Sequence, residues 1–476
     1  MVGSNHKIIL SGGRFSGTSR EQLAAAFDAF AGSAEKHTLV VHFHGEFVSE
    51  NAAEGIAERL LPLYQDAGGY PLFVMWQSGL GETLKNNWQE IITEDAFTAL
   101  VERVLQFAIG KLDQAPGERG GRVELPSRFA ITDEIQQKQS AGREPFAERE
   151  VEVANLDAEL APAEQAQFES ILDSDASLAN AAMELNRPDR PELAPTLEAE
   201  LEQERSTGEP GERALFTTTL LITVGVRILA RVLRRFVKDR NHGIYTTVIE
   251  EVARALLGDL IGGTLWKSMK KDTVDSFEGA SDTHGGTALI EEIGRLWQAG
   301  HKPRIVVIGH SAGTIYICHL LQKAAMLSED IRFEVVWLAP ACSFELLERT
   351  LVTADNRIAS FRSFGMNDEL EKRDAIFPPV YMRSLLYFIS GVLEEAVDLP
   401  LVGMKRYHTG APPFDAATFP EIKRVRDQFM EFTEPWIWSE NREGPGLSTL
   451  AHKHGDFDND PTTLESIAHL IAKEVT

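Results

Sequence analysis

The sequence contains little cysteine, little positive charge and no very long apolar run. Its two cysteines, Cys318 and Cys342, lie in apolar stretches of the 476 residues. They provide no disulfide framework and indicate buried thiols in a reducing compartment, so a cytoplasmic location is expected. The formal net charge of −25 repels the phosphates of nucleic acids, which argues against a nucleic-acid partner.

The apolar stretch from Ala214 to Val226 spans 13 residues, whereas a helix needs roughly 20 to cross a bilayer. No transmembrane span is therefore expected. Basic residues follow, so residues 214–240 predict a basic amphipathic helix. Such a helix could make peripheral contact with a membrane, form a lid over an apolar site, or be a buried core helix with its basic end in solvent. The basic residues are Arg227, Arg231, Arg234, Arg235 and Lys238.

The N-terminal residues MVGSNHKIIL lack a charged region followed by a long apolar region, so no signal peptide is expected. KIIL, TLVVHFHG and YPLFVMWQSG are typical of buried strands, and helical apolar spacing follows the first two. Toward the C-terminus, PRIVVIG, FEVVWLAPA and RIASFRSFG repeat the strand pattern. Strands alternating with helices predict an α/β fold with a mainly parallel, doubly wound sheet.

The strand pattern is interrupted in the middle of the chain. Residues 1–105 and 287–476 are predicted to form the α/β core, and residues 106–286 an insertion that forms a cap or lid. Residues 111–213 have about three acidic residues per basic one from Asp133 onward, which is typical of a partly disordered or loosely helical stretch. Residues 214–286 form the apolar and basic helical segment of the cap.

The most specific motif is Gly309-His310-Ser311-Ala312-Gly313. It fits G-x-S-x-G, with an apolar strand before it and a helix after it. A serine on such a sharp turn projects its hydroxyl above the sheet, and the flanking small residues let the turn close. The following helix points its N-terminal dipole at the reacting oxygen. Ser311 is therefore the predicted nucleophile, and Gly309 and Gly313 shape its turn.

With these flanks, the chain resembles the α/β-hydrolase superfamily in its serine esterase and lipase-like branch. The resemblance covers roughly residues 1–105 and 287–476. It implies an α/β-hydrolase fold, a Ser-His-acid triad, an oxyanion hole and an ester substrate that is a small molecule or lipid-like. It implies no cofactor and no metal.

The oxyanion hole of this family takes one donor from the residue after the nucleophile, which is Ala312 here. The second donor comes from the loop after an early strand. His44-Gly45-Glu46 resembles the family's His-Gly oxyanion loop, which implies the backbone N–H of Glu46 as that donor, with Phe47 as the alternative.

In this fold the triad acid follows the nucleophile in the chain, soon after a strand. RIASFRSFG ends near Gly365 and Asp368 follows at once, so Asp368 is the predicted acid that orients the base. Glu369 is its nearest competitor, and Glu371 and Asp374 also lie close in the sequence. An alternative is that this acidic segment only begins a helix.

The base is expected in a loop between the last strand and the last helix. LSTLAHKHGDF occupies this place, and His454 is the predicted base, with Gly455 allowing a tight turn. His452 is the rival. The sequence thus predicts a serine hydrolase that cleaves a carboxylic ester through an acyl-enzyme.

Two other functions stay open. One is a non-catalytic binding or effector protein on a hydrolase scaffold, with the acidic insertion as a docking surface. The other is a metallohydrolase that uses the pairs His42/His44 and His452/His454, although neither pair has the longer spacing of a known zinc signature. The length of the acyl chain and the oligomeric state do not follow from the sequence.

Overall fold

The computed structural model describes residues 2–33, 37–45, 50–77, 88, 95–114, 121–149, 157–187, 195–207, 210–258 and 265–473. The chain divides into two compact units. The sheet unit comprises Met1–Thr83, Lys267–Asp374 and Leu399–Thr476, and the helical unit comprises Leu84–Trp266 and Ala375–Asp398.

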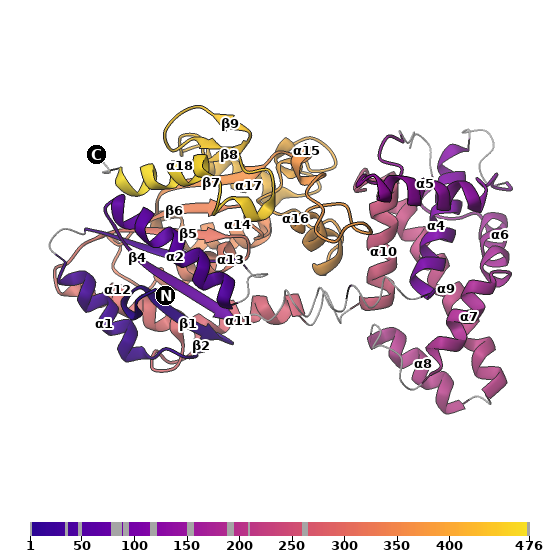
Figure 1. Cartoon of the computed structure of the whole chain (residues 1–476), viewed down its shortest axis with the longest axis horizontal. Helices are drawn as coiled ribbons and strands as arrows, with labels where there is room; N and C mark the ends of the chain where they lie inside the picture. Colours follow the sequence, from indigo (N-terminus) through magenta and orange to yellow (C-terminus); the bar gives the residue numbers. More distant parts are fainter. Residues whose placement is uncertain are drawn as a thin grey trace. The chain divides into compact units, whose positions relative to one another are not determined.

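The sheet unit is built on an eight-stranded sheet with the strand order β2-β1-β4-β3-β5-β6-β7-β8 (Figure 1). Only β2, at one edge, pairs antiparallel with β1, and all other pairings are parallel. The expectation of a mainly parallel α/β sheet is therefore confirmed. The strands are β1 Lys7–Ser11, β2 Arg14–Phe15, β3 Thr38–Phe43, β4 Gly69–Gln77, β5 Arg304–His310, β6 Phe333–Leu338, β7 Ile358–Met366 and β8 Trp436–Ser439. A second sheet pairs β9 Asn441–Arg442 with β10 Ser448–Thr449.

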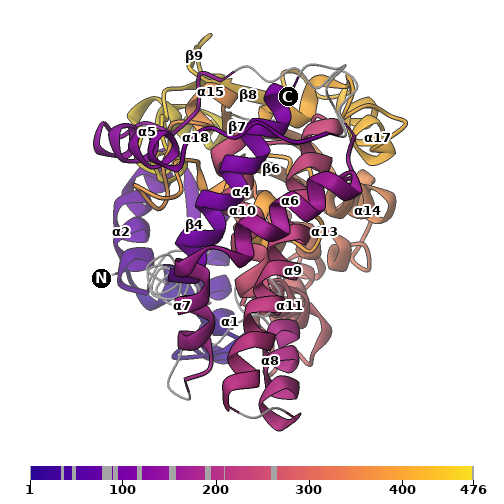
Figure 2. The ribbon, with the colours of Figure 1, turned by 90° about the vertical axis from the view of Figure 1, so that its right-hand side faces the viewer.

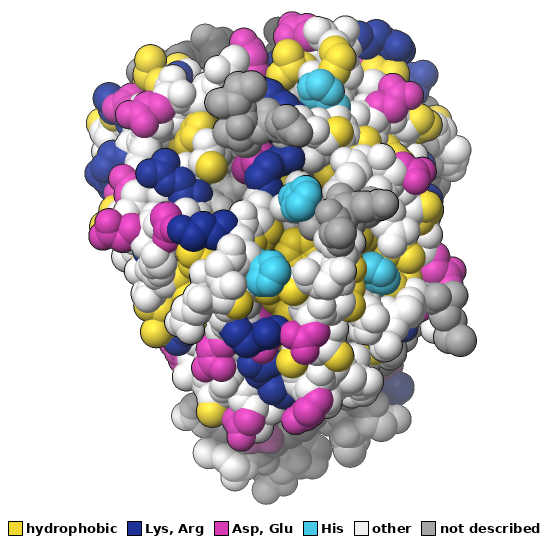
Figure 3. Space-filling view, turned by 90° about the vertical axis from the view of Figure 1, so that its left-hand side faces the viewer, with side chains coloured by type: hydrophobic (Ala, Val, Ile, Leu, Met, Phe, Trp, Pro, Cys, Tyr) yellow, Lys and Arg dark blue, Asp and Glu magenta, His cyan; other side chains and the backbone are white. Residues whose placement is uncertain are grey.

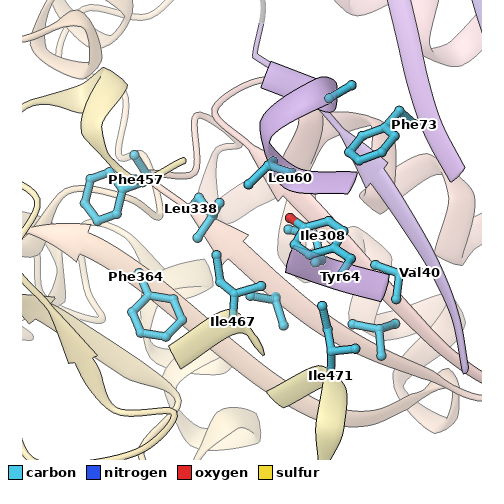
Figure 4. Close-up of a cluster of buried hydrophobic side chains, with 14 of the residues drawn as sticks. Val40, Leu60, Tyr64, Phe73, Ile308, Leu338, Phe364, Phe457, Ile467 and Ile471 are labelled. Carbon is cyan, nitrogen blue, oxygen red and sulfur yellow. The ribbon is translucent and has the colours of Figure 1, made fainter. Parts of the chain in front are cut away.

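Helices cover both faces of this sheet. Successive side chains of a strand point to opposite faces, so the apolar central strands pack against helices on each side. On one face, Val306 and Ile308 of β5 join a core with Leu60 of one helix and Ile467 of another (Figure 4). On the other face, Gly309 lies against Ile317. The helices of the unit are α1 Arg20–Ala31, α2 Glu50–Asp66, α11 Lys267–Glu278, α12 Gly285–Gln298, α13 Gly313–Ala324, α14 Phe344–Ala354, α15 Asp368–Glu371, α17 Pro420–Phe429 and α18 Pro461–Ala472. Leu60 belongs to α2, Ile467 to α18 and Ile317 to α13.

In the helical unit, the long helix α9 packs against α4, α6, α7, α8 and α10 (Figure 2). The apolar stripe of α9 is buried at Leu221, Ile228, Val232 and Phe236, whereas its basic side chains lie mostly on the exposed side. This pattern matches the core-helix interpretation of residues 214–240. The helices of the unit are α4 Asp95–Asp113, α5 Arg128–Ser140, α6 Pro162–Asp173, α7 Ala176–Leu185, α8 Pro195–Thr207, α9 Pro210–Val237, α10 Ile244–Gly258 and α16 Leu385–Phe388. Among the helices that the structure describes, none combines the length and the hydropathy that a bilayer span requires.

The boundaries of the units differ from those expected for the core and the insertion. The expected boundary at residue 105 falls inside α4, whose apolar side packs on α7 and α10 of the helical unit. Residues 267–286 belong to the sheet unit, and residues 375–398 form a second excursion into the helical unit. The acidic stretch 111–213 contains helices α5 to α8 within its described residues.

Candidate active site

Ser311 lies on the turn between β5 and α13, with a backbone φ of +51°. This angle is unusual for a residue with a side chain and stores strain. The turn closes because its neighbours have no Cβ. A Cβ on Gly309 would lie 2.7 Å from Ile317 Cδ1, and one on Gly313 would collide with the carbonyl oxygen of Phe43 in β3. The two glycines therefore have the role expected for them.

The backbone of Ser311 is held from both sides. Its N–H donates to the carbonyl oxygen of Leu338 at the end of β6, at 2.9 Å. Its own carbonyl oxygen accepts from the N–H of Ala341 at 3.1 Å and from Thr314 Oγ1 at 2.6 Å. These bonds offset the strain at the turn, so the hydroxyl is presented from a rigid support.

His454 contacts the serine directly. It begins the short turn His454–Asp456 that precedes α18, and its Nε2 lies 2.7 Å from Ser311 Oγ. Both side chains are buried. Burial is the main cause that holds the pKa of His454 well below its usual value of 6.5, with a further contribution from His310. The ring is therefore neutral near pH 7. With its one proton on Nδ1, such a ring accepts the hydrogen bond of the Ser311 hydroxyl at Nε2, as a general base requires. The structure brings Ser311 and His454 together, and His452 lies elsewhere.

In this tautomer the N–H proton of the His454 ring is on Nδ1. None of the described residues accepts a hydrogen bond from this nitrogen. Asp368, the expected acid, forms an ion pair with Lys372 one turn along, at 2.7 Å. Asp374 contacts His454 directly, because its Oδ2 accepts a hydrogen bond from the backbone N–H of His454 at 2.7 Å. Burial raises the pKa of Asp374, while this N–H acts in the opposite direction. The structure thus brings Asp374, rather than Asp368, into contact with the histidine.

A second histidine, His310, supports the loop of the first. Its ring stacks on that of His454 with centroids 5.3 Å apart, and its Nε2 donates to the carbonyl oxygen of His454 at 2.9 Å. On its other side, Nδ1 faces Asp458 Oδ2 at 3.6 Å. Burial raises the pKa of Asp458, but the interaction with His310 outweighs it, so that the pKa lies below its usual value. This pair connects the turn of the nucleophile to the turn of the base.

The expected oxyanion loop approaches the nucleophile from β3. Gly45 lies so close that a Cβ there would be 3.3 Å from Ser311 Cβ. His44 is anchored by Trp76, whose backbone N–H donates to His44 Nε2 at 3.0 Å and whose Nε1 donates to the His44 carbonyl oxygen at 3.1 Å. Ala312, the first expected donor, is fully buried at the start of α13. Glu46 and the alternative Phe47 lie outside the described residues.

The two H-x-H pairs are engaged in other ways. His42 Nδ1 bonds to Tyr64 at 3.0 Å, and burial lowers the pKa of His42 to about 3 and that of His44 to about 4. His452 is exposed and pairs with Glu440 at 2.6 Å. Within the described part of the chain, no group of three or more His, Cys, Asp or Glu side chains is arranged to hold a metal ion.

Sequence reasoning missed the positional roles of His310 and Asp458. His310 is the variable residue of the G-x-S-x-G motif, so nothing in the motif marks it. Asp458 follows His454 by four residues, and no motif marks it. Asp374 was a competitor for the acid, but its contact with His454 depends on how the chain turns after α15.

Comparison of this chain with protein-family models, with curated proteins and with solved structures finds no match. The chemistry is therefore inferred from geometry. A hydroxyl on a strained turn at the N-terminus of a helix, bonded to a buried neutral imidazole, is arranged for nucleophilic attack.

Proposed function

We propose that this protein is a serine hydrolase that cleaves a carboxylic ester through an acyl-enzyme. The observation that carries the proposal is the 2.7 Å hydrogen bond between Ser311 Oγ and His454 Nε2, made by a residue with a positive φ between a parallel strand and a helix. The mainly parallel sheet and this turn support an α/β-hydrolase fold as part of the proposal.

In the proposed reaction, Ser311 Oγ attacks the ester carbonyl carbon while its proton moves to His454 Nε2. The backbone N–H groups of Ala312 and Glu46 stabilise the negative oxygen of the tetrahedral intermediate. The intermediate collapses and the C–O bond to the alcohol breaks, with His454 donating its proton to the leaving oxygen. Water then attacks the acyl group, again giving a proton to His454, and the released acid restores Ser311.

The acid of the triad comes from the segment after β7. Chain order favours Asp368, which stays a prediction, while contact favours Asp374 because its carboxylate is already bonded to the His454 backbone. A carboxylate at Nδ1 would fix the tautomer and stabilise the imidazolium that forms in the reaction.

One observation favours the alternative of a non-catalytic binding protein, namely that Nδ1 of His454 has no partner among the described residues. In that case the serine and histidine would line a binding site without turnover. The cap or lid role of the helical unit, a peripheral membrane contact through residues 214–240, and a cytoplasmic location also stay predictions.

The deciding experiment is labelling of the full chain with a small fluorophosphonate, which reacts only with an activated serine. We expect wild type to be labelled and Ser311→Ala not to be labelled. Ser328→Ala, an exposed serine, is the matched control and should label like wild type. Folded wild type that takes no label would favour the binding protein. Esterase activity that survives Ser311→Ala and is lost with a chelator would favour the metallohydrolase.

A further inference from the structure

The helical unit contains a pocket of about 420 Å³. Its basic side chains come from α9, from the residues just after α9 and from α10, and residues 396–398 complete the lining. Six lining residues are basic and two are acidic, in a chain whose net charge is −25. On the face of the molecule drawn in Figure 3, by contrast, basic side chains lie among acidic ones. The basic residues of the pocket are Arg231, Arg234, Arg235, Lys238, Arg240 and Arg254, and the acidic ones are Glu251 and Asp398.

Most of this positive charge is not matched by a carboxylate. Arg240 pairs with the buried Asp398, with Nε and Oδ2 3.0 Å apart. Among the described residues, Arg254 donates to backbone carbonyl oxygens alone, including those of Glu394 and Glu395 at 2.7 Å. A carbonyl group carries no net charge, so the charge of Arg254 is not neutralised by these bonds. The exposed side chains at 231, 234 and 238 form no ion pair with any residue in the described part of the chain. The pocket therefore has a local excess of positive charge.

Arg235 shows that the pocket is more than a charged surface. Its side chain is buried, and Nη1 pairs with Glu250 at 2.7 Å and with Glu251 at 3.3 Å. Its Nε donates to the carbonyl oxygen of Arg240 at 3.2 Å. Nη2 is buried and has no partner among the described residues, and the same holds for Oε2 of Glu251. A buried donor and a buried acceptor without partners are costly unless a ligand satisfies them.

Basic residues near the C-terminus of a helix also stabilise its dipole. That explanation suits Arg234, in the last turn of α9, and Lys238, which follows the helix directly. It does not explain why Arg235 is buried while its Nη2 has no partner among the described residues. It also does not explain why Arg254, on α10, lines the same pocket. A ligand accounts for all four side chains.

We propose that this pocket binds a phosphomonoester that also carries a hydroxyl group. Phosphate oxygens accept from the planar guanidinium groups, which suit phosphate better than an ammonium group does. The hydroxyl donates to Glu251, which a fully deprotonated anion such as sulfate cannot do. The volume is within the range of small-molecule sites and exceeds what inorganic phosphate alone fills. The phosphomonoester belongs either to a soluble metabolite or to a lipid headgroup.

The soluble source is tested by titration calorimetry of the full chain with glycerol 3-phosphate. We expect wild type to bind it more tightly than sulfate. The triple variant Arg231→Ala/Arg234→Ala/Lys238→Ala should bind about tenfold more weakly or worse, since each charged hydrogen bond contributes ~1.5–3 kcal/mol. Arg227→Ala removes an exposed arginine one turn earlier on the same helix, outside the pocket, and should stay within about twofold of wild type.

The lipid source is tested by co-sedimentation with phosphatidylcholine vesicles that contain phosphatidic acid, with pure phosphatidylcholine vesicles as control. Binding to the first vesicles only, lost in the triple variant and retained in Arg227→Ala, assigns the ligand to a lipid. Glycerol 3-phosphate binding without vesicle binding assigns it to a soluble molecule. The proposal is overturned if wild type binds neither, if the triple variant binds as wild type does, or if sulfate binds as tightly as glycerol 3-phosphate.

Arg235→Lys tests the buried fork itself. It keeps the charge that pairs with Glu250 but cannot place a second nitrogen as arginine does, so phosphomonoester binding should weaken. The three exposed positions keep the proposal testable if this variant does not fold. Ser311→Ala should leave binding unchanged, which separates this pocket from the proposed ester hydrolysis.

Discussion

The sheet unit and the helical unit each bury a histidine at the centre of a polar cluster. The two clusters differ in the groups that bond to the ring nitrogens of that histidine. In the sheet unit, none of the described carboxylates bonds to a ring nitrogen of His454, and burial lowers the pKa of the ring so that it is neutral near pH 7. In the helical unit, His242 lies between Glu250 and Asp398, at 2.8 and 2.9 Å. Each ring nitrogen of His242 therefore faces a carboxylate, and an ionised carboxylate only accepts hydrogen bonds.

The difference separates the proposed active site from a cluster that holds the helical unit together. A neutral buried imidazole has a free lone pair and can take a proton from Ser311. A ring whose two nitrogens both face carboxylates links two segments of the chain. In this second cluster, Arg235 and Tyr381 bond to the same Glu250, whose pKa is lowered to about 2. Burial there acts to raise that pKa but is outweighed by the charges of His242 and Arg235.

The first prediction replaces the two histidines in turn. His454→Ala should lower kcat/KM for a soluble ester by about 10³-fold or more, because the general base is lost, with little loss of folding stability. His242→Ala should leave hydrolysis of the same ester largely intact. It should lower the free energy of unfolding by about 3–5 kcal/mol, since two buried carboxylates lose their shared partner. Kinetic assays and denaturant melts measure the two effects.

His452→Ala is the matched control, because this histidine is exposed and its partner Glu440 is exposed as well. It should stay within about twofold of wild type in activity. If His452→Ala were inactive and His454→Ala active, the assignment of the base would be reversed.

The second prediction concerns the carboxylate that would orient His454, the proposed general base. Asp374→Asn keeps an oxygen that can accept from the His454 backbone but removes the charge. We expect kcat to fall by about 10²-fold or more with KM nearly unchanged, since only the transition state carries an imidazolium. If Asp374 had only a structural role, kcat would not fall selectively while KM stays nearly unchanged. Asp368→Asn is the paired variant, and a larger loss of kcat there would return the role of the acid to the residue that chain order favours.

Local patterns predicted the parts of the fold and site that depend on neighbours in the sequence. The apolar run before Ser311 and the glycines beside it predicted the strand, the turn and the helix, and chain order placed His454 in the same site. The short edge strands β2 and β8 have too few residues for a periodic signal. Asp374 contacts His454, which is 80 positions away in the sequence. His310 faces Asp458, which is 148 positions away. Such contacts depend on tertiary packing rather than on spacing.

The helical unit also contains structure that the sequence pattern does not predict. Helix α8, in the acidic stretch 111–213, has a mostly polar sequence, yet it buries Leu197 and Leu201 and packs against α9. Two apolar residues one turn apart are a weak helical signal until a partner helix is present. The basic pocket has no motif either, because its residues come together only when α9, α10 and residues 396–398 are folded.

The third prediction is the smallest in magnitude and uses pH to separate the two units. In the sheet unit, burial holds the pKa of His42 near 3 and that of His44 near 4, against 6.5 when unfolded. The unfolded chain therefore binds protons first as the pH falls, and stability is lost from about pH 6.5 downward. The loss reaches at most about 2 kcal/mol per buried imidazole at pH 5. In the helical unit, Glu250 has a folded pKa of about 2 against 4.5 when unfolded, so its contribution is complete above pH 4.5 and is lost only as the pH falls toward 2.

Between pH 6.5 and pH 4.5, the sheet unit should therefore weaken while the Glu250 cluster keeps its full contribution. Hydrogen exchange followed by mass spectrometry, corrected for the intrinsic pH dependence of exchange, resolves the two units by peptide. We expect protection in β3 and α2, which surround His42, to fall at pH 5 relative to pH 7, and protection in α10 to hold. Equal losses in β3 and α10 would contradict this prediction, because the shifts of His42 and His44 weaken only the sheet unit between pH 6.5 and pH 4.5, whereas Glu250 keeps its contribution there.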